Sequence, residues 1–111
     1  TAIARVRQVH VDDQIYDYIA RLAEVTRTHP LLKLGISPRG ALALCRTAKA
    51  RAFAEGRDFV VPEDVTQMAE YVFAHRLMLS SKARLNEYTP EAIVAEVLAQ
   101  TQPPVLSERR A

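Results

Sequence analysis

Three of the six prolines in this 111-residue chain stand at the start of a segment whose apolar residues recur three and four positions apart. Proline has a fixed φ and no backbone N–H, so it is favoured at the first position of a helix and disfavoured in the interior. Pro38, Pro62 and Pro90 therefore each predict a helix that begins there. A further helix is predicted over residues 13–28, because Asp12 can cap it and apolar residues follow at helical spacing, namely Ile15, Tyr18, Ile19, Leu22 and Val25.

Short connections join these helices. His29-Pro30 ends the first helix, because the residue before a proline avoids the helical region. Gly56 offers a left-handed cap to the second helix. LLKLG, residues 31–35, is typical of a short extended piece that ends in a turn. HRLML, residues 75–79, can continue the third helix or form a second extended piece near LLKLG, and we favour the second.

The predicted fold is therefore all-α: a small four-helix domain with one short extended pair. A chain of 111 residues is long enough for one modest core, so one domain is expected over residues 1–102. The two prolines and charged finish of TQPPVLSERRA predict a C-terminal tail over residues 103–111.

Composition places the chain among ordinary globular domains. Hydrophobic residues make up 49% of it and charged residues 25%, which argues against disorder. The net charge of +2 is too small to indicate a nucleic-acid partner by itself. The single cysteine, Cys45, excludes an internal disulfide and favours a reducing, cytoplasmic compartment. No apolar run approaches ~18 residues, so no membrane partner is expected. The start, TAIARVRQV, has no signal-peptide core, and we expect the chain to be part of something longer.

A phosphate loop is the first catalytic motif to consider. GISPRGAL has the spacing of such a loop, but Ala41 and Leu42 stand where the required Lys and Ser/Thr would be. The motif is therefore rejected.

No other residues form a catalytic set. The three histidines, His10, His29 and His75, lie far apart without ligand partners at metal spacing, so no metal site is expected. Cys45 falls on an alanine- and leucine-rich face and is expected in the core. The acids Glu63 and Asp64 begin the third helix, where the helix dipole alone explains them. By itself, the chain is expected to be catalytically inactive.

Arg39 is the unusual residue, because it lies in the first turn of a helix. That end is positively polarised and normally carries acidic residues. A helix start also exposes free N–H groups that attract anions. Ser37 and Pro38 fix where this helix begins, and Gly35 and Gly40 are expected to leave the approach to Arg39 uncrowded. The arrangement favours a phosphate brought by another surface, whereas a solvated surface arginine is the simpler alternative.

Four motifs carry a family resemblance. They occur in the order Ser37-Pro38-Arg39, Gly56-Arg57-Asp58-Phe59-Val60, Pro62-Glu63-Asp64-Val65 and His75-Arg76-Leu77. In this order the chain resembles the lid subdomain of AAA+ ATPases, most closely the MoxR family, over roughly residues 11–79. The resemblance implies that Arg39 is the sensor-2 arginine, which touches the γ-phosphate of ATP. Ser37, Pro38, Arg39 and Gly40 would then form the nucleotide-facing helix start.

The resemblance also implies cofactors and partners. ATP and Mg²⁺ would bind the full-length protein, with Mg²⁺ held by a core domain outside this sequence and nothing bound to this chain alone. The partners would be that AAA+ core, copies of the protein in a ring, most often a hexamer, and von Willebrand factor A domain proteins. Proteins of this family are chaperone-like.

Two other classes of function stay open. A small helical nucleic-acid-binding module is suggested by Arg46, Lys49, Arg51 and Arg57, although no series of Asn, Gln or Arg residues follows Arg39 to contact base edges. In a partner-docking module, Arg39 would pair with a carboxylate of another protein.

Two residues depart from the family pattern. Val61 stands where similar lids often have threonine, so the third helix is expected to lack a side-chain cap. Gly40 stands where many have alanine, and it is expected to loosen the hold on Arg39.

Overall fold

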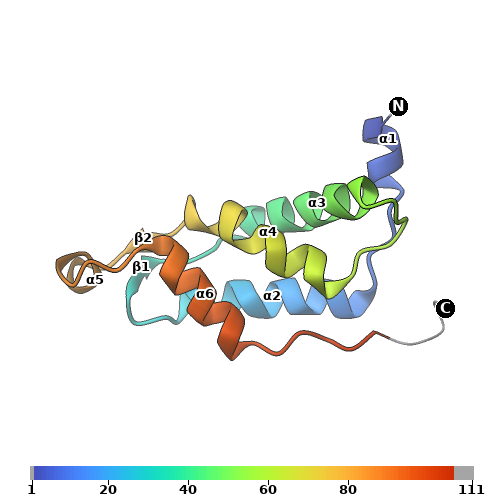
Figure 1. Ribbon diagram of the computed structural model, residues 1–111. Coiled ribbons are helices and arrows are strands. Elements are labelled where there is room, and N and C mark those ends of the chain that lie inside the picture. Colours follow the sequence, from blue (N-terminus) through green and yellow to red (C-terminus); the bar gives the residue numbers. More distant parts are fainter. Residues whose placement is uncertain (1, 107–111) are drawn as a thin grey trace.

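The computed structural model describes residues 2–106 and shows helices joined by short loops, with one small sheet (Figure 1). The predicted mostly helical fold is confirmed, and each of the predicted helices begins at the predicted residue. These are α2 (Asp13–Arg27), α3 (Pro38–Ala54), α4 (Pro62–Ala74) and α6 (Pro90–Gln100).

Two shorter helices in the described residues were not predicted, α1 (Ala2–Arg7) and α5 (Ser81–Leu85). Each has fewer than two full turns, so an apolar repeat of 3.6 residues cannot be recognised in it. α5 begins at a side-chain cap, because the Ser80 Oγ accepts a hydrogen bond from the N–H of Ala83 at 3.1 Å.

The short extended pair is also confirmed. β1 (Leu32–Leu34) and β2 (Met78–Leu79) run antiparallel, with Leu32 opposite Leu79 and Leu34 opposite Met78. Residues 75–79 therefore do not continue α4, which ends at Ala74. The sheet brings the segment that follows α4 beside the segment that follows α2.

The core lies between the long helices. α3 packs along α4, α6 packs on α4, and α2 packs on both α3 and α6 (Figure 1). The predicted apolar stripe of α2 faces this core, with Val25 half-buried and the rest buried. α1 and α5 lie at opposite ends of the molecule (Figure 1).

The segment after α6 stays in contact with the helices as far as it is described. The carbonyl of Gln102 accepts a hydrogen bond from the Arg21 guanidinium at 3.3 Å, and Leu106 packs partly against the core. Residues 107–111 of the predicted tail lie outside the described residues.

The start of α4 has no side-chain cap from its N-cap residue, Val61, as predicted. Instead, the carboxylate of Asp64 accepts a hydrogen bond from the N–H of Val61 at 2.8 Å. The Asp64 N–H bonds only to the backbone carbonyl of Val61, at 2.9 Å, so a side-chain acceptor at position 61 would complete a reciprocal cap.

We expect Val61→Thr to stabilise the chain by about 0.5–1 kcal/mol, because threonine keeps the branched shape and adds the missing acceptor. Val61 is half-buried, so some packing is exchanged for the cap. Chemical denaturation measures the change, and Val61→Ala, which removes packing without adding an acceptor, is the matched control. A midpoint at or below that of the parent, with the same slope, would show that packing outweighs the cap.

Candidate functional site

The predicted site residues lie together in the first turn of α3. Ser37 is the N-cap, and its Oγ accepts a hydrogen bond from the N–H of Gly40 at 3.2 Å. Pro38 is the first helical residue. Ser37, Pro38 and Arg39 are exposed, whereas Gly40 is buried. The predicted cap is therefore present, and it directs the first turn of α3 toward solvent.

Contacts with α2 hold this helix start in place. The N–H of Ile36 donates to the Thr26 Oγ1 at 2.9 Å, and the Nε of Arg27 donates to the Ile36 carbonyl at 2.7 Å. Gly35 packs directly on the α2 backbone, because a Cβ there would lie 2.7 Å from Arg27 N. Glycine at position 35 thus allows the close approach of two backbone segments.

Arg39 makes no hydrogen bond or ion pair with any residue in the range 2–106. Its neighbours explain why it stays exposed. The first turn of α3 carries no acidic residue, and the positive end of the helix dipole repels a guanidinium. A cation held there without a partner is available to an anion from outside the chain.

Gly40, which was expected to loosen the hold on Arg39, lies against two side chains. A Cβ at this position would lie 3.0 Å from the Cγ2 of Ile36 and 3.1 Å from the Cδ of Arg76. The space that an alanine methyl would occupy is therefore bordered by the Arg76 side chain. Arg76 follows α4 in the chain, and its stem lies against the first turn of α3.

A hollow of about 510 Å³ opens beside this turn. Four cationic residues contribute to its wall: Arg27 at the end of α2, Lys33 in β1, Arg39 in α3 and Arg76 after α4. Among the described residues that line it there is no Asp or Glu. The residues come from four separate segments, so sequence spacing could not group them. The local signs were the S-P-R motif that contains Arg39 and the H-R-L motif that contains Arg76.

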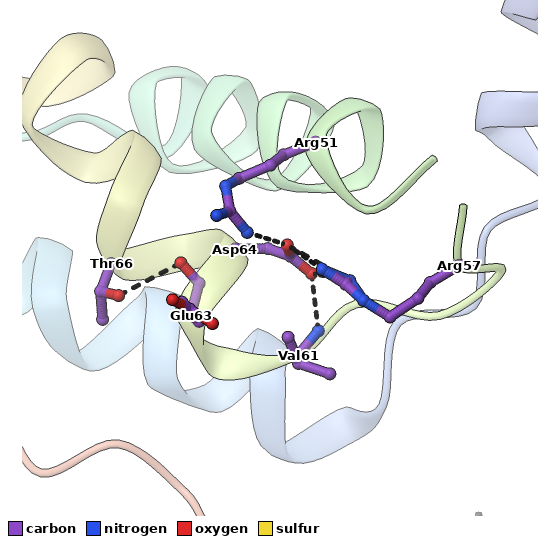
Figure 2. Close-up of polar contacts among 6 residues, drawn as sticks. All are labelled: Arg51, Arg57, Val61, Glu63, Asp64 and Thr66. Carbon is purple, nitrogen blue, oxygen red and sulfur yellow. Dashed lines mark hydrogen bonds and ion pairs between the residues drawn. The ribbon is translucent and has the colours of Figure 1, made fainter. Parts of the chain in front are cut away.

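A second cluster of charges has a structural role (Figure 2). Asp64 is completely buried, and its Oδ1 lies 2.6 Å from the Arg51 Nη1 and 2.7 Å from the Arg57 Nη2. Its Oδ2 accepts from the Arg57 Nη1 at 3.1 Å and from the Val61 N–H. Asp64, which the helix dipole alone was expected to explain, is therefore a buried ion-pair partner that joins α3, α4 and the loop between them.

This cluster weakens the nucleic-acid interpretation. Of the four cations on which that interpretation relied, Arg51 and Arg57 are bound to Asp64. The Lys49 ammonium donates to the Arg7 carbonyl at 3.0 Å. Arg46 is exposed. The charges do not form a stripe of free cations along α3, which is what phosphate backbone contacts need.

The cysteine and the three histidines, which were considered as possible catalytic or metal-binding residues, lie apart from the start of α3. Cys45 is buried in the core as predicted, and burial raises the pKa of its thiol, which disfavours the reactive thiolate. His29 is buried, with its Nε2 3.4 Å from a Glu96 carboxylate oxygen, whereas His10 and His75 are exposed.

Residues 2–106 contain neither a cluster of metal ligands nor a membrane-spanning helix. In this range no group of three or more His, Cys, Asp or Glu side chains could hold a metal ion. None of the described helices is long and apolar enough to span a bilayer.

The fold is a set of packed helices with one antiparallel pair of short strands and a capped, cation-bearing helix start. A family model described as "AAA lid domain" matches residues 24–97. The chain belongs to the AAA lid domain family. The resemblance to the lids of MoxR-family ATPases that the motifs predicted is confirmed.

Relatives and a solved structure agree with this placement. The chain is 40% identical over 100 residues to the uncharacterized protein YeaC of Bacillus subtilis (strain 168), covering 90% of this chain and 31% of that protein. It is 33% identical over 97 residues to the chaperone MoxR1 of Mycobacterium tuberculosis, covering 79% of this chain and 26% of that protein. The crystal structure of a putative ATPase from Cytophaga hutchinsonii superposes with a TM-score of 0.87 at 27% identity, over 92% of this chain and 34% of that one.

The chain therefore spans about a third or less of the length of these proteins.

Proposed function

We propose that this chain is the lid of a MoxR-like AAA+ ATPase and that Arg39 is its sensor-2 arginine, contacting the γ-phosphate of ATP bound by an adjoining core domain. The observation that carries the proposal is an exposed arginine, without a partner in residues 2–106, at the capped start of α3 in a chain of the AAA lid domain family.

The residues present fit a triphosphate. The hollow beside Arg39 is lined by cations and by no described carboxylate, which suits a polyanion. Mg²⁺ prefers carboxylate and phosphate oxygens. We propose that its protein ligands belong to the core domain, as the resemblance to AAA+ lids implies.

Arginine suits a sensor because its guanidinium is always charged and can bond two phosphate oxygens at once. Arg39 would hold the lid in one orientation when the γ-phosphate is present and would lose its main partner after hydrolysis. A hydrogen bond to a charged group contributes about 1.5–3 kcal/mol, which biases a two-state equilibrium about tenfold to hundredfold. The contacts of the α3 start with α2 would carry that change into the packing of the lid.

The assembly follows from the same proposal. The lid would pack on its own core domain, and the protein would form a ring, most often a hexamer, in the cytoplasm. The chaperone named MoxR1 supports a chaperone-like activity, and von Willebrand factor A domain proteins are the proposed partners.

The experiment uses the protein that joins this chain to an AAA+ core. We expect it to bind a non-hydrolysable ATP analogue more tightly than ADP, and Arg39→Ala to reduce that preference by about tenfold or more. Arg46→Ala, which removes an exposed arginine elsewhere on α3, is the matched control and should leave the preference unchanged. Equal preferences for the parent and Arg39→Ala would rule out the sensor role.

A docking module is the second candidate. It is favoured by the same free Arg39, which could pair with a partner's carboxylate instead of a phosphate. In that case Arg39→Ala would weaken subunit association without changing the preference for ATP over ADP.

A further inference from the structure

We infer that Arg76 is a second phosphate-binding cation, so that the polyphosphate of the bound nucleotide is held by two arginines, Arg39 and Arg76, from different parts of the lid. The inference rests on the proposed function, because it concerns the same helix start. It adds Arg76, which lies 37 positions after Arg39 in the sequence and follows the end of α4, whereas Arg39 lies at the start of α3.

The first support is placement. Arg76 and Arg39 line the same hollow, and Arg76 is exposed there. Its stem passes over the first turn of α3, with its Nε 3.6 Å from the position that a Cβ of residue 40 would take. The guanidinium is therefore brought to the turn that carries Arg39.

The second support is the number of free donors. Within residues 2–106, the Arg76 side chain donates to one acceptor, the Val72 carbonyl, which lies 3.3 Å from Nη1. A guanidinium has five N–H donors in a planar fork, so most of the Arg76 fork is unused. No carboxylate of the described residues forms an ion pair with it.

The third support is the charge around the hollow. Arg27 is bound through its Nε to the Ile36 carbonyl, a neutral acceptor that leaves the positive charge uncompensated. Lys33, Arg39 and Arg76 add to it, and like charges brought together are unfavourable until an anion binds. Elsewhere in the same chain, at Asp64, two arginines are compensated by a buried carboxylate. The hollow differs from that cluster in having no described carboxylate in its wall.

Binding through both arginines would have a mechanical consequence. Arg39 moves with α3, whereas Arg76 connects the end of α4 to β2. An anion held by both would tie α3 to the α4–β2 connection, so loss of the phosphate would release two parts of the lid rather than one.

The test begins with this chain and inorganic tripolyphosphate at low ionic strength, followed by NMR or calorimetry. We expect saturable binding that Arg76→Gln and Arg39→Gln each weaken by about threefold to tenfold, since each removes one charge-assisted contact in a solvent-exposed site. Arg46→Gln lowers the net charge equally, away from the hollow, and should weaken binding less than twofold. Equal weakening by Arg46→Gln and Arg76→Gln, or no saturation by about 10 mM, would overturn the inference.

Gly40→Ala tests the same point without removing a charge. Ile36 is completely buried, so the flexible Arg76 stem is the neighbour expected to move away from the added methyl. We expect Gly40→Ala to weaken tripolyphosphate binding by less than Arg76→Gln does, because the methyl displaces the Arg76 stem by only a few tenths of an ångström, and to weaken it no further when Arg76→Gln is already present. If Gly40→Ala weakens binding equally with and without Arg76→Gln, Gly40 acts through another residue, whereas parental binding by Arg76→Gln itself would overturn the inference.

The two proposals fail differently. If Arg39→Ala leaves the preference for ATP in the longer protein intact while Arg76→Gln still weakens tripolyphosphate binding, the sensor assignment fails and the anion site stands. If that preference depends on Arg39 but Arg76→Gln binds tripolyphosphate like the parent, the second-cation inference fails alone.

Discussion

On the proposed sensor-2 role, Arg39→Ala in a protein that joins this chain to an AAA+ core is expected to lower ATP turnover by about tenfold or more while leaving the unfolding midpoint of the lid nearly unchanged. Turnover should fall because a charge-assisted contact with the transferred phosphate is lost. Stability should not fall, because Arg39 has no partner in residues 2–106 and faces the positive end of the α3 dipole. Steady-state hydrolysis and chemical denaturation measure the two effects separately.

Two further variants sharpen this prediction. Arg39→Lys should recover only part of the turnover, because an ammonium cannot bond two oxygens in a planar fork. Arg46→Ala is the suitable control, since Arg46 is exposed on the same helix and lies outside the hollow. Arg57 would be a poor control, because it binds the buried Asp64 and its loss would alter the fold. Parental turnover in Arg39→Ala would show that the sensor assignment is wrong.

The largest effect on stability is expected at Asp64. Asp64→Ala should destabilise the chain by about 3 kcal/mol, the lower part of the range for removing one partner of a buried ion pair. The lower part applies because the Arg51 and Arg57 side chains are 22% and 23% exposed and can partly rehydrate. The N–H of Val61 would also lose its side-chain acceptor.

The neighbouring acid supplies the control. Glu63 lies in the same first turn of α4 but is exposed, so Glu63→Ala should cost less than about 0.5–1 kcal/mol, the value of a dipole contact. Asp64→Asn keeps the shape and one acceptor oxygen and should fall between the two. Denaturant midpoints at constant slope measure all three, and an Asp64→Ala variant as stable as Glu63→Ala would contradict the structural role of the cluster.

The long helices could be predicted because their signals are local. Pro38, Pro62 and Pro90 mark helix starts through their own backbone geometry, and the buried stripe of α2 shows in the spacing of its apolar residues. The short extended pair was predicted from the segments LLKLG and HRLML, which follow the ends of α2 and α4. α1 and α5 lacked enough turns to show any period, and α5 depends on a single serine cap.

The candidate site also has one part that local sequence signals predict and another part that they do not. Ser37, Pro38 and Arg39 are adjacent in the chain, so the capped helix start with its arginine could be found from the residues alone. The other cations that line the hollow beside that turn could not be found from the sequence. Arg27, Lys33 and Arg76 come to it through the packing of α2, the β1–β2 pairing and the end of α4, over separations that no local pattern encodes.

The glycines and Asp64 show how tertiary contacts change the meaning of a residue. Gly35 packs on the α2 backbone and Gly40 lies against Ile36 and Arg76, which are contacts that the sequence did not indicate. Asp64 suggested an ordinary first-turn acid, yet it is buried between two arginines. The sequence by itself determined where the main helices begin and that Arg39 stands at the start of one, because caps, prolines and apolar periods act within a few residues. Only the tertiary structure decided which cations are neutralised and which stay free, because that depends on which side chains meet across helices distant in the chain.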